Sequence, residues 1–214
     1  MELIPKKHGG RISMPRVSSE SSRVPEMEDL ILSALSAHHA TISQIEHYLR
    51  PGIEKAAMQI VECFRRGNRV LLCGNGGSAA DAQHIAAEFV GRYQTERRPL
   101  PAISLTTDTS ALTAIGNDYG FDEVFGRQVE ALSRYGDVLI AITTSGNSAN
   151  VLRAIEAARR VGAYSIGLLG GSGGKAEPLV DLPLVVSATS VARIQEAHIL
   201  IGHIVCEAVD ASFG

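Results

Sequence analysis

Five short, mostly apolar runs separated by helical patterns constrain the fold of this chain more than any other feature. Uninterrupted apolar strands that alternate with helices are typical of a parallel sheet covered on both faces. We therefore predict an α/β fold with a five-stranded parallel sheet. The predicted strands are Val70–Cys73, Pro101–Leu105, Asp137–Ile142, Tyr164–Leu169 and Leu182–Val186, with helices over 79–92, 107–116, 121–132, 149–161 and 191–212.

Two helical segments precede the first strand. Apolar residues keep helical spacing from Pro25 to about Arg50, and Pro51 begins a second helix that ends near Arg66. A minimal α/β domain does not need this extension, so we expect it to pack against a partner subunit. Residues 1–25 are rich in Lys, Arg, Ser, Gly and Pro and predict a flexible tail, which leaves one domain over 26–214.

Composition narrows the function classes. The formal net charge of −3 does not suggest a nucleic-acid-binding surface. No apolar run is long enough to span a membrane, and no apolar core follows the basic N-terminus as it would in a signal peptide. Cys63, Cys73 and Cys206 lack paired or metal-type spacing, which predicts buried free thiols and a cytoplasmic protein.

Two predicted strands end in loops that suit a phosphate group. Gly74-Asn75-Gly76-Gly77-Ser78 follows the first strand, and Thr143-Thr144-Ser145-Gly146-Asn147-Ser148 follows the third. Glycines let the backbone approach an anion closely, hydroxyls can donate to it, and a helix N-terminus follows each loop. Alternatively, Ser148 only caps its helix and the other residues only form turns. Two such loops in one sheet favour phosphate binding.

A dinucleotide-binding loop is the rival interpretation, because Gly74, Gly76 and Ala79 match the pattern G-x-G-x-x-G/A. That pattern requires an acidic residue about 20 residues further on. Asp108 comes too late in the chain to serve. The helix behind the loop also carries polar residues such as His84, where a nucleotide-binding helix mostly packs apolar ones. The rival is therefore disfavoured.

His84 and Glu88 are four residues apart, so they share one face of the predicted helix. Such a pair can be half of a metal site, an acid–base pair or a surface contact. Its position two turns after a phosphate loop favours a chemical role over the surface contact.

The last predicted helix carries Gln195 and His203. From Ile199 to Val205 it is apolar except for Gly202 and His203, which indicates burial in a core or a subunit interface. A lone histidine there is more often a core residue than a catalyst. Gln195 and His203 are about 12 Å apart along the axis and about 80° apart around it. A metal or substrate would therefore lie between their tips, or the groups would come from neighbouring subunits.

Taken together, these motifs resemble the phosphoheptose isomerase family, which has the sugar isomerase (SIS) fold. The resemblance covers about residues 27–213. The residues that carry it are Cys73–His84, Glu88, Thr113–Tyr119, Thr144–Ser148, Arg193–Glu196, His198 and His203.

The resemblance implies a flavodoxin-like three-layer sandwich and a homotetramer with active sites at subunit interfaces. It implies conversion of D-sedoheptulose 7-phosphate to D-glycero-D-manno-heptose 7-phosphate, the first step of nucleotide-heptose synthesis for lipopolysaccharide cores or other surface glycans. It also implies one zinc ion per subunit, with His84, Glu88, Gln195 and His203 as ligands. The implied substrate-binding residues are Asn75, Gly76, Gly77, Glu88, Asn117, Asp118, Thr143, Thr144, Ser145, Ser148 and Gln195.

The expected chemistry is proton transfer between adjacent carbons through an enediol, with Glu88 as base and His203 handling a proton at oxygen. Zinc would polarise the carbonyl oxygen, but a carboxylate bound tightly to zinc is a poorer base, so the two roles of Glu88 conflict. Arg92 either aids substrate binding or lies at the surface, and His198 is expected to pack.

The alternative is a non-catalytic SIS-domain protein that binds phosphosugar or associates with a replication initiator. That class keeps the loops and lacks the acidic residue and the late histidine, so Glu88 and His203 favour the enzyme. A sugar-phosphate isomerase of another specificity, such as one for pentose phosphates, would share the loops.

Overall fold

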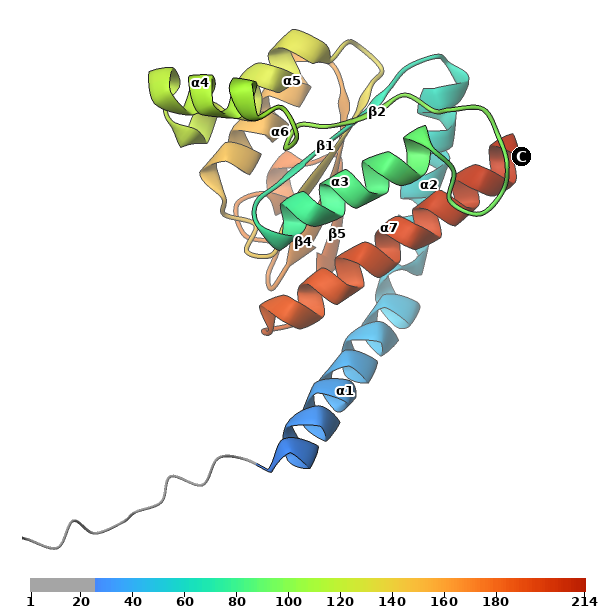
Figure 1. Ribbon diagram of the computed structural model, residues 1–214. Coiled ribbons are helices and arrows are strands. Elements are labelled where there is room, and N and C mark those ends of the chain that lie inside the picture. Colours follow the sequence, from blue (N-terminus) through green and yellow to red (C-terminus); the bar gives the residue numbers. More distant parts are fainter. Residues whose placement is uncertain (1–25) are drawn as a thin grey trace, which may run out of the picture.

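A five-stranded parallel sheet forms the centre of the protein. The computed structural model describes residues 26–214, so the predicted tail over 1–25 lies outside the described residues. The strand order is β2-β1-β3-β4-β5, and every neighbouring pair is parallel (Figure 1). The predicted fold class is confirmed. The strands are β1 (Val70–Gly74), β2 (Ala102–Ser104), β3 (Val138–Thr143), β4 (Tyr164–Gly170) and β5 (Leu182–Val186).

Helices cover both faces of this sheet. One face packs Phe64 and Phe89 beneath the last helix, and the other packs Val129 and Ile155. Alternate residues of β1 separate between the two cores, Leu72 into the first and Leu71 into the second, as the pleat requires. The helices are α1 (Met27–Gln44), α2 (Arg50–Arg65), α3 (Gly77–Val90), α4 (Thr109–Tyr119), α5 (Gly126–Leu132), α6 (Ala149–Val161) and α7 (Val191–Phe213), with short turns η1 (Ile45–Leu49), η2 (Phe121–Glu123) and η3 (Glu177–Leu179).

Several predicted helix boundaries were wrong, by two or three residues for the helices predicted over 79–92 and 107–116. The helix predicted from residue 107 begins at Thr109, because the Asp108 carboxylate accepts the Ala111 N–H and caps it. The helix predicted over 121–132 is interrupted between η2 and α5. The break predicted before Pro51 is a π-helical turn, so the chain stays helical; a proline is tolerated in a first turn, where its missing N–H is not needed.

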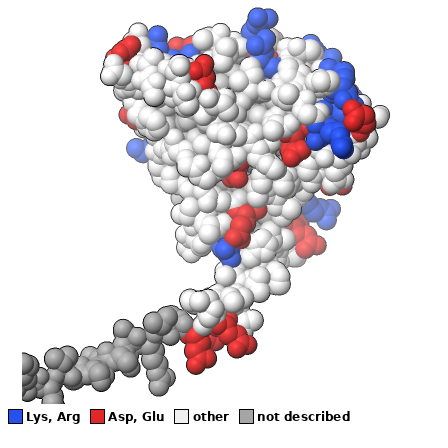
Figure 2. All heavy atoms as spheres, viewed as in Figure 1, with Lys and Arg blue, Asp and Glu red and all other residues white. Residues whose placement is uncertain are grey.

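The N-terminal helix α1 extends away from the body of the domain (Figure 1). Leu30, Ile31 and Leu35 are about half exposed on it. Beyond its acidic first turn, the visible surface of α1 carries no charged residue (Figure 2). The helix therefore presents an apolar surface that the described chain does not cover. Within residues 26–214, no helix is long and apolar enough to cross a membrane.

Candidate active site

Two loops meet where the strand order reverses. β1 and β3 are neighbours, and their following helices α3 and α6 are not on the same face, so a crevice is expected beyond their carboxyl ends. Asn75 Nδ2 donates to the side-chain oxygen Oδ1 of Asn150 at 2.8 Å, and Asn150 Nδ2 donates back to Asn75 Oδ1 at 2.9 Å. This reciprocal pair ties the two predicted phosphate loops together. Sequence reasoning missed Asn150, which belongs to no recognised motif.

The β1–α3 loop depends on its glycines. Gly76 has a φ of 55°, a left-handed conformation that favours glycine, and it precedes the first residue of α3. A Cβ at Gly77 would collide with the side-chain amide of Gln195. The glycines thus turn the chain into α3 and let α7 approach its N-terminus.

The β3–α6 loop collects hydroxyl groups. Thr143 is buried, and its Oγ1 lies 3.2 Å from Ser148 Oγ. Ser148 precedes α6 at the capping position, yet its side chain makes no capping hydrogen bond. The alternative that Ser148 only caps a helix is therefore not what the structure has. The first backbone N–H groups of α6 stay available for an anion.

A second glycine loop braces these hydroxyls. Gly146, with a φ of 65°, packs so closely on Gly173 that a Cβ would collide with the Gly173 carbonyl. The Asn147 amide donates to the Ser145 carbonyl oxygen at 2.8 Å, and its own oxygen accepts the Lys175 N–H at 3.1 Å. The loop conformation is thus fixed from β4 as well as β3. The sequence signal for this brace was the run of glycines at 170–174.

The two site helices, α3 and α7, lie side by side on one face of the sheet. A Cβ at Gly202 of α7 would lie 2.5 Å from Ile85 Cδ1 of α3, so the glycine allows the close approach. His84 Nε2 lies 2.9 Å from His203 Nε2 and 3.3 Å from Glu88 Oε1. His84 is thus the centre of a three-residue cluster within one chain.

Tyr93 lies just beyond α3 and completes the surroundings of His203, with ring centroids 5.4 Å apart. Gln195 is on the same helix as His203 but lies two turns earlier, against Gly77. The roughly 12 Å between Gln195 and His203 along α7 is close to the roughly 10.5 Å between Gly77 and His84 along α3. Sequence reasoning treated the last helix alone and did not foresee this pairing.

Asn117 and Asp118 lie apart from this cluster. Both are exposed near the end of α4, and the Asn117 amide donates to the Asp118 carboxylate at 2.8 Å. Arg92 is also exposed; it donates to the Gln94 carbonyl oxygen at 3.1 Å and its Nε lies 3.5 Å from Glu96. Within residues 26–214 these side chains are not in polar contact with the phosphate loops.

Two titratable groups on the site helices α3 and α7 have shifted pKa values. Burial raises the pKa of the Asp81 carboxyl, while nearby His84 acts in the opposite direction, and Asp81 Oδ2 is buried without a hydrogen-bond partner. His198 is fully buried and donates from Nε2 to the Leu169 carbonyl oxygen at 3.0 Å. Burial lowers the pKa of His198 to about 4, with the Leu169 bond opposing the shift. His198 thus packs in the core, as expected.

The cluster has donors that zinc accepts, namely two imidazole nitrogens and a carboxylate. Ligands on a tetrahedral zinc at about 2.0–2.1 Å lie roughly 3.3 Å from one another. The separation between His84 and Glu88 matches that value, and the separation between His84 and His203 is a few tenths of an ångström shorter. In the described part of the chain, no group of three or more His, Cys, Asp or Glu side chains is arranged so that it could hold a metal ion. The donor types of the cluster nevertheless fit zinc.

The fold and the paired loops define a SIS-domain protein, and a family model described as "SIS domain" matches residues 35–170. The phosphoheptose isomerase of Aliarcobacter butzleri is 56% identical over 184 residues, which cover 86% of this chain and 97% of that protein. Solved phosphoheptose isomerase structures from Neisseria gonorrhoeae and Francisella tularensis are 45% and 41% identical, with TM-scores of 0.82 and 0.84. Each match covers 86% of this chain and 98% of the solved one. The chain belongs to the phosphoheptose isomerase family.

Proposed function

We propose that this chain isomerises D-sedoheptulose 7-phosphate to D-glycero-D-manno-heptose 7-phosphate through an enediol, and so supplies heptose for lipopolysaccharide or another surface glycan. Family membership supports the reaction. The observation that carries the assignment to this site is the placement of His84, Glu88 and His203 on α3 and α7, with α3 beginning at the first phosphate loop. One helix thus links the anion-binding loop to the acid–base groups.

The phosphate of the substrate is assigned to the β3–α6 loop. Thr143, Thr144, Ser145 and Ser148 would donate hydroxyl hydrogen bonds, and the start of α6 would add N–H groups. On the sugar side, Asn75, Gly76, Gly77 and Gln195 would contact the chain of hydroxyls. Asn117 and Asp118 are assigned to the sugar from the family pattern, and their exposed position suits a contact completed by substrate or by a neighbouring subunit.

Proton transfer is assigned to Glu88 and His203. Glu88 would take a proton from the carbon next to the carbonyl and return it to the neighbouring carbon, which converts ketose to aldose. His203 would donate a proton to the oxyanion that develops on the ketose carbonyl, and would take a proton from the neighbouring hydroxyl as the aldose carbonyl forms. The same side chain would protonate the ring oxygen when the sugar ring opens. The contact with His84 orients His203, and the Tyr93 ring covers it on another side.

A zinc ion is part of this proposal. His84, Glu88, Gln195 and His203 would hold it, one ion per subunit. When bound, the ion supplies Lewis acidity that polarises the substrate carbonyl oxygen. The imidazole and carboxylate donors of the cluster support the assignment.

We further propose a homotetramer with active sites at subunit interfaces, acting in the cytoplasm. A groove of about 960 Å³ between α2, η1 and α7 supports an interface; its apolar lining includes Ile45, Ile53, Met58, Leu200 and Ile204. The exposed apolar surface of α1 continues beyond it. All three cysteines are free thiols, as suits a reducing compartment.

The direct test is to incubate the purified protein with D-sedoheptulose 7-phosphate and follow the aldoheptose product, with and without a chelator. A pentose ketose phosphate serves as the matched control substrate. The proposal expects aldoheptose formation that the chelator suppresses and added Zn²⁺ restores. Binding of the heptose phosphate without any product would instead support a non-catalytic SIS-domain protein. Preference for the pentose substrate would assign a different isomerase specificity.

A further inference from the structure

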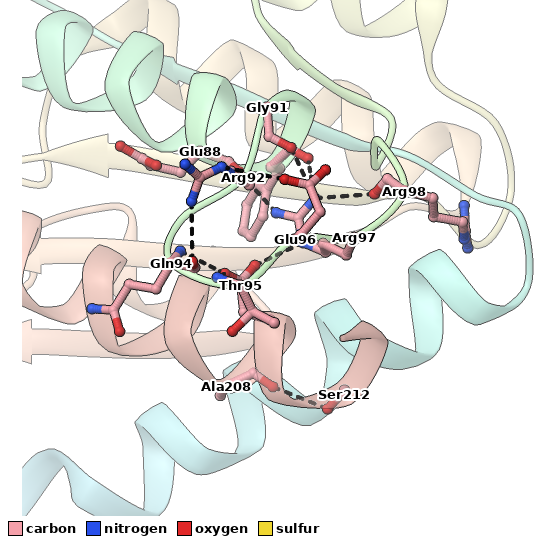
Figure 3. A network of polar contacts seen from close by, with 12 residues as sticks. Glu88, Gly91, Arg92, Gln94, Thr95, Glu96, Arg97, Arg98, Ala208 and Ser212 are labelled. Carbon is pink, nitrogen blue, oxygen red and sulfur yellow. Dashed lines mark hydrogen bonds and ion pairs between the residues drawn. The ribbon is translucent and has the colours of Figure 1, made fainter.

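Arg97 has no solvent-exposed side-chain surface, although it lies in the segment 91–101 between α3 and β2. Its Nη2 donates to the Glu88 carbonyl oxygen at 2.8 Å. Its Nη1 donates to the carbonyl oxygens of Phe89, Gly91 and Arg98 at 2.9, 3.3 and 3.1 Å. Figure 3 shows the guanidinium reaching into the end of α3. The carbonyls of Glu88, Phe89 and Gly91 lie at the C-terminal end of α3, where a helix leaves carbonyls without intrahelical partners, so Arg97 caps α3 at its negative end. The Arg98 carbonyl belongs to the loop that follows.

The remaining guanidinium nitrogen binds a carboxylate on the other site helix. Arg97 Nε donates to Asp210 Oδ1 of α7 at 2.7 Å, and Asp210 is 2% exposed. Asp210 Oδ2 accepts the N–H groups of Gln94 and Thr95 at 2.7 and 2.9 Å. Burial acts to raise the pKa of Asp210, but these N–H groups and Arg97 outweigh it and hold the pKa below its usual value. The carboxylate is therefore charged at neutral pH and fully bonded.

This network joins α3 and α7, the two helices that carry the cluster, to the segment 91–101 that carries Tyr93. On α3, the backbone carbonyl oxygen of Glu88 accepts a hydrogen bond from Arg97 Nη2. Asp210 is seven residues after His203, so it lies two turns along nearly the same face of α7. The loop fixed by Asp210 also carries Tyr93, whose ring contacts His203. The relative placement of Glu88, His203 and Tyr93 thus depends on one buried ion pair.

Stability alone does not account for such a pair. Two charges taken out of water lose hydration, and a well-packed apolar pair of the same volume is often as stable or more so. Leucine or methionine in place of Arg97 and Asp210 could join α3 to α7 but could not fix the backbone carbonyl of Glu88. The charged pair also fixes orientation. The planar guanidinium of Arg97 bonds to the end of α3, to Asp210 on α7 and to the segment 91–101 at the same time.

We propose that Arg97 and Asp210 are positioning residues for the isomerase reaction, which hold Glu88 on α3 and His203 on α7 in reacting geometry. This inference rests on the proposed function of those two residues. The phosphate loops lie at the opposite end of α3 from the pair, so substrate capture is independent of it. Loosening the pair therefore affects turnover and leaves substrate affinity nearly unchanged.

The test compares Arg97→Lys and Asp210→Asn with the control Arg98→Lys, an identical change at the adjacent exposed arginine. Lysine keeps the charge but offers three donors that cannot reach five acceptors across two helix ends. We expect kcat to fall roughly 10–100-fold in both variants, as for other partners that orient site residues, with KM within about threefold of the wild type. Arg98→Lys should keep both constants. Asp210→Glu should recover part of the lost kcat, because it restores the charge.

Activity is measured at a temperature where circular dichroism shows each variant folded, so kcat refers to folded protein. An unchanged kcat in folded Arg97→Lys and Asp210→Asn overturns the inference, even if their Tm falls, because the pair is then only structural. Failure of Arg97→Lys, Asp210→Asn and Asp210→Glu to fold also overturns the inference. Glu88→Gln, assayed in parallel, separates the two proposals. If Glu88→Gln stays active, the proposed site is wrong, whereas an inactive Glu88→Gln beside active Arg97→Lys rejects only the positioning role.

Discussion

His84 and His203 face one another with 2.9 Å between their Nε2 atoms, although 119 residues separate them in the chain. Two imidazole nitrogens can meet at this distance only if one donates a proton and the other accepts it, or if both face a cation. Both rings lie within the cluster with Glu88, so a cation between them would gain three ligands from a single chain.

We therefore predict that Zn²⁺ stabilises the protein through this pair. An excess of 100 times the dissociation constant should add about 2.7 kcal/mol to the free energy of unfolding and raise Tm in a thermal-shift assay. His84→Gln and His203→Gln should lose most of that shift. The matched control is His47→Gln, which changes an exposed histidine of η1 and should shift like the wild type. Equal zinc shifts in all four proteins would remove the metal assignment.

Glu88 should be required for turnover but not for folding. Its side chain is about one-fifth exposed and its partner His84 is itself half exposed, so Glu88→Gln leaves no buried charge unpaired. We expect kcat to fall by roughly 10²–10⁴-fold, the usual contribution of a general base, with Tm and oligomeric state unchanged. Glu207→Gln, on the exposed face of α7, is the control and should keep full activity. Near-normal kcat in Glu88→Gln would mean that another group is the base.

Much of this site could be predicted from the sequence, because its parts are local. A strand followed by Gly74-Asn75-Gly76-Gly77 has few other uses, and the four-residue spacing of His84 and Glu88 fixes their shared face once α3 is recognised. The apolar runs predicted the strands to within two residues, because strands in a sheet covered on both faces carry apolar side chains on both faces.

What the sequence did not reveal is how distant elements pair. The close approach of Gly202 to Ile85 places α7 beside α3, and the sequence of neither helix alone indicates that the two pack together. Arg97 lies in a run of charged residues, Glu96-Arg97-Arg98, that reads as a solvated surface. The structure shows instead that the Arg97 side chain is buried and bound to Asp210, which lies 113 residues later in the chain.

The close approach at Gly202 gives a third prediction. Gly202→Ala places a methyl group 2.5 Å from Ile85 Cδ1 in a buried contact, so α7 must move away from α3. We expect a loss of about 1–3 kcal/mol in stability, as for other overpacked cores, and a lower kcat because His203 moves with α7. The double variant Gly202→Ala with Ile85→Val removes the colliding methyl group and should recover both quantities in part. No recovery in urea unfolding or kcat would show that the two residues are not coupled.

His198 predicts a specific acid sensitivity. Its folded pKa of about 4 lies below the unfolded value of about 6.5, so the unfolded chain binds a proton first as pH falls. If His198 were protonated in the folded protein, its buried Nδ1–H would have no hydrogen-bond acceptor. Stability should thus be intact above pH 6.5 and fall by roughly 2–3 kcal/mol between pH 7 and pH 4.5 through this residue.

The comparison for that effect is His198→Gln, which keeps a donor for the Leu169 carbonyl oxygen but does not titrate. Urea unfolding at both pH values should show a smaller acid loss in the variant by that amount. Protonation of Asp210 also destabilises the fold at lower pH, but it affects both proteins alike. Identical acid losses would show that His198 is not buried as a neutral ring.

The apolar surface of α1 predicts dependence of activity on assembly. Ile31 and Leu35 are 52% exposed each and lie one turn apart, near the centre of the apolar stripe. Replacing both by Glu puts two charges into any contact that covers this stripe, so we expect the tetramer to dissociate. Light scattering after size exclusion measures the mass, and the isomerase assay measures the consequence. If active sites need two subunits, kcat falls together with the mass.

The control is Ser33→Glu, which adds a charge about 180° around the same helix from that stripe and should leave mass and activity unchanged. Circular dichroism should show the same helix content in both variants, because glutamate is a good helix former. A dissociated variant with full activity would place the complete site within one chain, as the cluster of His84, Glu88 and His203 already is. A tetramer that survives both substitutions would place the subunit contact elsewhere, with the groove beside Met58 as the next surface to change.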